Sequence, residues 1–198
     1  MLIELTSVPT QALPIGVFKE HLRLGSGFSD SGMQDAILET YLRAALAAIE
    51  ARTGKVLLER EMRWDVTEWR SRTRQPLPLA PVSAIVSLTR RAPSGVSEVV
   101  APERYALEPD LQRPSIVTTG ASLPTVPRGG RIEIALLAGF GPEWSDLPSD
   151  LRQAVLLLAA HFHEFRAAEP VPGSALPQSV AALIERYRTV RIFLGSRS

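Results

Sequence analysis

The chain has 198 residues, of which 45% are hydrophobic and 22% charged, a composition typical of a soluble globular protein with a packed core. It has no cysteine, which excludes disulfides, cysteine metal sites and thiol nucleophiles. The N-terminal segment lacks a basic stretch before its apolar residues, and the most apolar stretch, 151–162, is too short to span a bilayer. We therefore expect no signal peptide and no membrane partner.

The net charge of +1 is unevenly distributed along the chain. Residues 60–131 carry 11 basic and 7 acidic side chains, whereas the flanking segments are slightly acidic. Of the 22 basic residues, 20 are arginines. Arginine suits protein interfaces and phosphate contacts, but the codon bias of a GC-rich genome would explain the preference for arginine over lysine equally well.

The first 54 residues are predicted to be helical. A short helix is expected over 14–24, because proline is tolerated in a first helical turn. A second helix is expected from Ser29 or Asp30 to Thr53, with Gly54 as its C-terminal stop. Its apolar residues recur every four positions and so form one stripe, made by Met33, Ile37, Tyr41, Ala45 and Ile49.

From residue 55 to 141 the period changes to two, which predicts strands. Apolar and polar residues alternate over 61–67, 84–88 and 132–136. Weaker strands are expected over 105–107 and 115–118, where flanking prolines keep the segments short or at sheet edges. These segments predict a small, loop-rich, antiparallel sheet.

Helices are expected again over residues 146–194. The first opens at Pro148 and carries the clearest amphipathic pattern of the chain, Leu151, Ala154, Val155, Leu158, Phe162 and Phe165. A last helix is marked by Val180, Leu183, Ile184 and Tyr187. The predicted fold is therefore α+β: a helical bundle built from N- and C-terminal helices, with a small antiparallel β insertion, in one domain spanning 1–198.

No pattern in the sequence predicts catalysis, a cofactor or a metal. His161 and His163 are two residues apart on a helix and so point about 200° apart, which does not suit one ion. The zinc-protease spacing, the nucleophile elbow and the Gly-rich phosphate loops are all absent from the sequence.

Two clusters are candidate interfaces with protein or DNA. Arg70, Arg72 and Arg74, together with Arg90 and Arg91, are predicted to form a basic patch on the β part. The alternative is a solvated loop.

The second cluster is the C-terminal end. Arg188, Arg191 and Phe193 lie in an arginine-rich, apolar segment that suits docking into a groove of a neighbour. The alternative is that this end completes the helical core.

In order and spacing, the segments resemble the small head–tail connector, or adaptor, proteins of long-tailed phages and gene transfer agents. The resemblance covers most of the chain, except the proline-rich stretch 90–130. It rests on the segments LPIGVFKEHLRL, DAILETYLRAALAAIEARTGKVL, EMRWDVTEWR, PLPLAPVSAIVSLT, RIEIALLAGFG, LPSDLRQAVLLLAAHFHEFR and SVAALIERYRTVRI.

The resemblance implies a structural, non-enzymatic subunit of a ring at the head–tail interface of the particle, made in the bacterial cytoplasm. Such rings are usually twelvefold, bind the portal protein on one side and neck or tail-side proteins on the other, and let DNA pass transiently through the centre. We expect a subunit that is monomeric before assembly.

Three alternatives remain open at this point. The first is a tail-terminator or other neck protein. The second is a nucleic-acid-binding module that uses the Arg70–Arg91 region. The third is a small hydrolase, for which the sequence offers no convergent set of polar groups.

Overall fold

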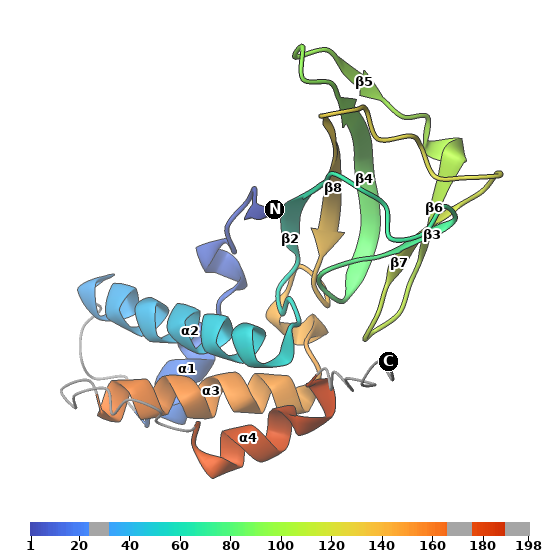
Figure 1. The fold of residues 1–198 in the computed structure, drawn as a ribbon. Helices are drawn as coiled ribbons and strands as arrows, with labels where there is room; N and C mark the ends of the chain where they lie inside the picture. Colours follow the sequence, from blue (N-terminus) through green and yellow to red (C-terminus); the bar gives the residue numbers. More distant parts are fainter. Residues whose placement is uncertain (24–31, 166–175, 189–198) are drawn as a thin grey trace.

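The structure, a computed structural model, describes residues 1–23, 32–165 and 176–188. The described chain forms two regions, which lie one above the other in Figure 1. The helical region contains the α-helices, and the β region contains two antiparallel sheets.

The helical region is assembled from both ends of the chain. Helices α1 and α2 come from the N-terminal part, and α3 and α4 from the C-terminal part. Their bounds are Ile15–His21, Gly32–Thr53, Ser149–Glu164 and Gln178–Ile184. Three short 3-10 helices accompany them: η1 (Thr10–Ala12), η3 (Trp144–Asp146) and η4 (Glu185–Tyr187).

Most of the apolar residues predicted to line the helices form one core, but two of them, Ile37 and Phe165, are 48% and 55% exposed. Helix α2 packs against α3, with α1 on α2 and α4 on α3. Phe18, Leu42, Ile49, Leu151 and Leu158 are each 0% exposed within this core. At about 25 cal/mol per Å² of apolar surface removed from water, this burial is what holds the helices together.

The ends of the helices follow the expected local chemistry. Gly54 has a φ of 68°, the left-handed conformation that glycine adopts without strain, and its N–H donates to the carbonyl of Glu50. Pro148 is the N-cap of α3. The segment around Ser29 and Asp30, predicted to cap α2, lies outside the described residues.

The β region contains a five-stranded and a three-stranded sheet. The first has the order β1-β2-β8-β4-β5, and the second the order β3-β7-β6. All pairs are antiparallel. The strands are β1 (Leu2–Glu4), β2 (Arg60–Val66), β3 (Arg74–Pro76), β4 (Val82–Arg91), β5 (Ser97–Val99), β6 (Tyr105–Glu108), β7 (Ser115–Thr118) and β8 (Arg131–Ala138); a 3-10 turn, η2 (Pro102–Arg104), precedes β6.

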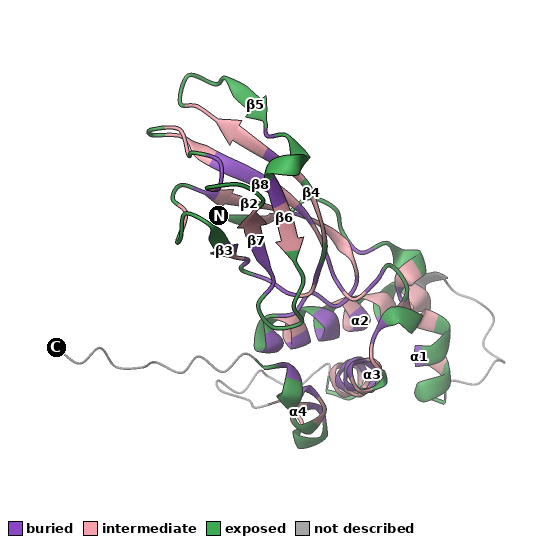
Figure 2. Ribbon diagram, turned by 90° about the vertical axis from the view of Figure 1, so that its right-hand side faces the viewer, coloured by how far each residue is buried: buried purple, intermediate pink, exposed green. Residues whose placement is uncertain are grey.

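The two sheets share a second hydrophobic core. Ile132 and Ile134 of β8 and Leu88 of β4 are 0% exposed on the inner face of the five-stranded sheet, and Ile116 of β7 meets them from the other sheet, also at 0%. Figure 2 shows this purple interior of the β region and a separate one between the helices. The strand alternation in the sequence places these residues inward.

The predicted fold class is wrong in its proportions. The fold is a sheet-rich α+β structure, not a helical bundle with a small β insertion, because the eight strands form two sheets with a core of their own. Sequence alternation missed β1, β3 and β5. Each has only three residues, too few for a period-two pattern, and β3 ends in a proline.

An ion pair and a hydrogen bond link the two regions. The Arg60 side chain of β2 is 9% exposed and reaches Glu50 of α2 at 2.7 Å and Glu4 of β1 at 3.1 Å. Nearby, the buried Lys55 donates through Nζ to Oε1 of Gln112 at 2.7 Å, and burial lowers the pKa of this lysine. Within the described residues, no helix has the length and apolarity to cross a membrane.

Candidate interaction surfaces

The predicted basic patch is largely ion-paired in the structure. Arg74 Nη2 lies 2.6 Å from Glu108 Oε1 across the three-stranded sheet. Arg90 Nη1 lies 2.9 Å from Glu98 Oε2 of the neighbouring strand, and its Nε donates to the carbonyl of Thr125 at 3.1 Å. Each of these arginines therefore has a carboxylate partner within reach.

Arg91 belongs to a larger network on the outer face of the five-stranded sheet. It donates two hydrogen bonds to Glu133, at 2.7 and 2.8 Å, and Arg131 reaches the same carboxylate at 2.7 Å. Arg131 also lies 3.4 Å from Asp65, which is 3.2 Å from Arg63. We call these five residues the outer-face network.

Glu133 is the centre of the outer-face network. Its side chain is 10% exposed, and hydrogen bonds from Arg91 and then Arg131 lower its pKa to about 2, although burial opposes them. The carboxylate is therefore charged at any physiological pH. Three arginines and two carboxylates leave this face with a small positive charge, screened by close pairing.

Arg70 and Arg72 differ from the other predicted patch residues. Both are exposed in the turn before β3, and no carboxylate of the described residues pairs with them. The backbone carbonyl of Arg72 accepts from Leu123, two residues before the Thr125 carbonyl that Arg90 contacts. The segment around Leu123 thus brings the two halves of the predicted patch near one another.

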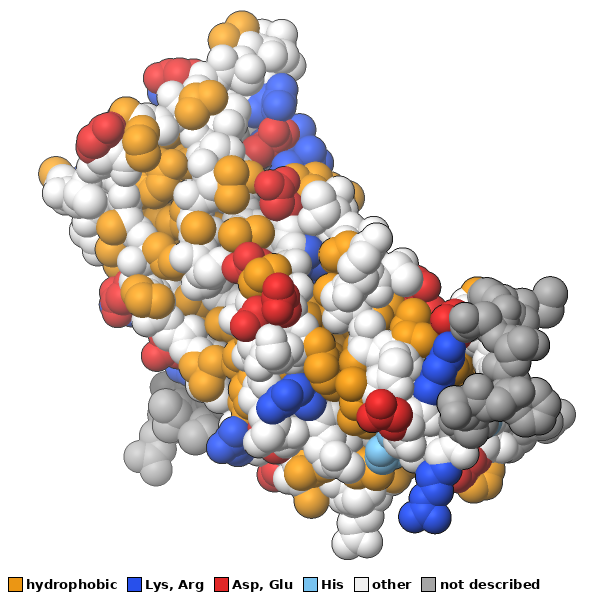
Figure 3. Space-filling view, turned by 180° about the vertical axis from the view of Figure 1, so that it is seen from behind, with side chains coloured by type: hydrophobic (Ala, Val, Ile, Leu, Met, Phe, Trp, Pro, Cys, Tyr) orange, Lys and Arg blue, Asp and Glu red, His pale blue; other side chains and the backbone are white. Residues whose placement is uncertain are grey.

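Figure 3 shows acidic and basic side chains side by side on the β region, not gathered into one basic surface. Pairing of Arg74, Arg90 and Arg91 is the physical cause. A role for these arginines at an interface stays a prediction. Such a role requires cationic side chains without a carboxylate partner, and among the five predicted patch residues these are Arg70 and Arg72.

The predicted C-terminal docking element divides into a packed part and a part outside the described residues. Tyr187 is 2% exposed, packs edge-on against Phe140 and donates to Asp150 at 2.9 Å. Arg188 is exposed and pairs with Glu185 at 2.9 Å. Arg191 and Phe193 lie outside the described residues, so the docking role stays a prediction.

The two histidines of α3 contact aromatic rings. His163 stacks edge-on against Tyr41 of α2, with ring centroids 5.7 Å apart, and His161 lies 4.6 Å from the ring of Phe165. Across the part of the chain that the structure describes, no three His, Asp or Glu side chains gather in an arrangement that holds a metal ion.

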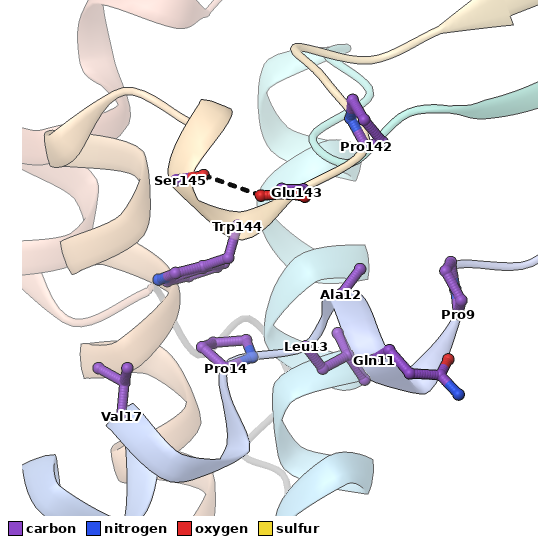
Figure 4. Close-up of a pocket in the computed structure, with 10 residues that line it drawn as sticks. All are labelled: Pro9, Gln11, Ala12, Leu13, Pro14, Val17, Pro142, Glu143, Trp144 and Ser145. Atoms are coloured by element: carbon purple, nitrogen blue, oxygen red, sulfur yellow. Dashed lines mark hydrogen bonds between the residues drawn. The ribbon is translucent and has the colours of Figure 1, made fainter.

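An apolar groove of about 590 Å³ opens on the helical region between η1 and η3 (Figure 4). Trp144 points from η3 toward Pro14 and Val17 at the start of α1. Glu143 is the one ionisable residue of the lining, and it is exposed. The complete lining of this η1–η3 groove is Pro9, Gln11, Ala12, Leu13, Pro14, Val17, Pro142, Glu143, Trp144 and Ser145.

Two features of the groove leave it open to a ligand. Val17 is 45% exposed although it is aliphatic. Among the described residues, the indole N–H of Trp144 has no acceptor, and no cationic side chain pairs with Glu143. The Glu143 carboxylate accepts from the backbone N–H of Asp146 and from the hydroxyl of Ser145 at 3.5 Å.

The lateral edges of the five-stranded sheet are apolar as well. Val99 of β5 is 69% exposed and Val96 beside it 66%, while at the opposite edge Leu2 of β1 is 43% exposed and Leu5 46%. Edge strands present unpaired backbone groups that accept another chain.

Of the outer-face network only Arg91 was predicted from the sequence, and the groove was not predicted. Residues 131 and 133 alternate with buried isoleucines, so the period-two pattern does place them together on the outer face. A signal for the groove was the tryptophan after Gly141–Pro142, a large apolar residue in a turn. Its partners around Pro14 are far away in sequence, and only the folded chain brings them together.

No protein-family model and no curated protein matches the chain. Solved structures do match over the whole length.

A chain in the neck of an empty gene transfer agent particle, computed with C6 symmetry, is 50% identical, with a TM-score of 0.89 over 100% of both chains. A chain in the virion of a native gene transfer agent particle is 51% identical, with a TM-score of 0.86 over 98% of both chains. A chain in the neck of a native particle, computed with C12 symmetry, is 47% identical, with a TM-score of 0.85 over 100% of both chains.

Proposed function

Because this chain belongs to the family of gene transfer agent neck proteins, we propose that it is the head–tail adaptor subunit of such a particle. A member of this family is a structural component of the particle, located at the head–tail interface. The observation that carries the proposal is the full-length likeness to neck chains at 47–50% identity.

The adaptor works as a ring. Similar chains lie in necks computed with C6 and C12 symmetry, and these symmetries support a ring of twelve copies. A ring subunit needs two different side faces that fit each other head to tail. The apolar β1 and β5 edges, on opposite sides of the five-stranded sheet, are suitable parts of such faces.

The partners of the ring are the portal protein on the head side and neck or tail-side proteins below it. DNA passes through the centre only transiently. A channel for passing DNA is better served by paired than by free arginines, since each free cation that neutralises a phosphate adds affinity. The pairing of Arg74, Arg90 and Arg91 supports this role and weakens the case for a nucleic-acid-binding module.

The function requires no catalysis. Its relatives are parts of a structural assembly. The surfaces of the described residues suit contacts between proteins: apolar strand edges, an open groove and long helices.

Electron microscopy of the purified protein, mixed with the portal protein of the same particle, tests the proposal. We expect the chain to form a ring that caps the tail-facing end of the portal. A chain that stays unattached to an intact portal contradicts the adaptor role, and attachment to the tail tube supports the tail-terminator alternative.

A further inference from the structure

The η1–η3 groove has the chemistry of a docking site for an extended peptide. Its floor is apolar, formed by Leu13, Pro14, Val17 and Trp144, and its volume of about 590 Å³ lies in the range of ligand pockets. Its only ionisable group is the carboxylate of Glu143. A complementary peptide would carry large apolar side chains, with cationic and no anionic neighbours.

One segment of this chain has that composition. Residues 189–198, with the sequence TVRIFLGSRS, lie outside the described residues. The segment contains Ile192, Phe193 and Leu194 in a row, has Arg191 and Arg197 on either side, and has no acidic residue. The apolar residues match the groove floor, and the arginines match Glu143.

The proposed ring, in which each copy needs a head-to-tail contact with the next, favours a neighbouring copy over the same copy. Helix α4 lies on the opposite side of α3 from α1 (Figure 2). Tyr187 fixes the end of the described chain there, through its contacts with Phe140 and Asp150. The tail segment thus begins on one side of the helical region, while α1 borders the groove on the other side.

We propose that residues 189–198 of one copy dock in the η1–η3 groove of the next copy. Repeated around a ring, this contact is head to tail, the type that closes cyclic assemblies. Ten residues reach up to about 33 Å when extended, enough to cross to a neighbour. The inference rests on the proposed ring and names one contact that joins its subunits.

Disulfide trapping tests the contact, because the chain has no cysteine of its own. Full-length Val17→Cys protein is mixed with full-length Phe193→Cys protein of different tag size, and the mixture is oxidised. We expect a mixed disulfide dimer on non-reducing gels. The matched control replaces Val17→Cys with Val86→Cys, which is more exposed at 53% and lies on β4, outside the groove and away from the sheet edges; we expect at least tenfold less dimer.

A charge exchange separates docking from chance collision. Glu143→Arg in the Val17→Cys protein is expected to lower the dimer yield at least threefold, and Arg191→Glu in the Phe193→Cys protein to restore it. A yield equal to that of the Val86→Cys control overturns the inference. So does an intramolecular disulfide as the sole product of the double variant Val17→Cys/Phe193→Cys, because the tail would then occupy its own groove.

The proposed function fails by a different observation. If the chain is absent from the particle neck, the adaptor role is contradicted whatever the trapping result. If the chain is present in the neck and no mixed disulfide forms, the tail contact alone is contradicted.

Discussion

The helical region and the β region are stabilised by different kinds of contact. Apolar packing dominates between the helices, where Leu42 and Leu158 are fully buried. In the β region, a similar core is covered on its outer face by the network centred on Glu133. Six of the eleven arginines in residues 60–131 are therefore ion-paired, whereas the helical region offers an apolar groove with one ionisable lining residue, Glu143. A cluster of basic residues in a sequence therefore does not by itself predict a basic surface, because carboxylates from other strands can pair with the arginines.

The largest effect is expected where the two regions meet. Arg60→Ala leaves Glu50, 17% exposed, without its cationic partner, and the loss of one member of a buried pair costs about 3–5 kcal/mol of unfolding free energy. Denaturant unfolding followed by circular dichroism measures it. Arg74→Ala, in a pair about half exposed, is the matched control and should cost less than about 1 kcal/mol. Equal losses in the two variants would show that the Arg60 pairs do not join the regions.

Substitutions in the two cores test whether the helical region and the β region unfold together. Leu158→Ala in the helical core and Ile134→Ala in the β core each remove a side chain that is 0% exposed, and each should cost about 2–5 kcal/mol. The sequence predicts a single domain. If that is correct, Leu158→Ala raises amide hydrogen exchange in both regions, as measured by mass spectrometry. Faster exchange confined to the helices would contradict the single-domain prediction.

The outer-face network predicts a pH-dependent contribution to stability. Since the pKa of Glu133 falls from 4.5 to about 2 on folding, its contribution is complete above pH 4.5 and is lost as the pH falls toward 2. Glu133→Gln should therefore lower the unfolding free energy by about 1–3 kcal/mol at pH 6, and the difference from the natural chain should shrink at low pH.

The matched control for this substitution is Glu108→Gln, whose side chain is 47% exposed beside Arg74. It is expected to change stability by less than about 1 kcal/mol at pH 6. A Glu133→Gln variant that stays as stable as the natural chain at pH 6 would show that the network adds nothing to the β region.

The smallest effect concerns DNA. With Arg74, Arg90 and Arg91 paired, Arg70 and Arg72 are the predicted patch residues left for phosphates. Two phosphate contacts give a slope of log affinity for DNA against log salt concentration of about −2. The double variant Arg70→Ala/Arg72→Ala should abolish this salt dependence, whereas Arg74→Ala/Arg90→Ala should leave it unchanged. Fluorescence anisotropy with duplex DNA measures the slope. A much steeper slope would support the nucleic-acid-binding alternative instead.

The sequence predicted much of the secondary structure, because long segments have clear periods. The helix over Ser149–Glu164 and the strand over Ser115–Thr118 lie where the pattern placed them. The prediction was wrong about the size of the β part, since short edge strands such as Ser97–Val99 have no readable period. The partners of the arginines were not predictable either: Arg91 and Glu133 are 42 residues apart and meet only through strand pairing.

The proposed role of this chain, as the ring-forming adaptor of a particle neck, can be tested in intact particles. The test is cryo-electron microscopy of particles from producing cells, in which this chain carries a small added domain as a marker. We expect twelve copies of the marker in one ring between portal and tail. Particles whose complete neck lacks the marker, or carries it only on the tail tube, would contradict the claim.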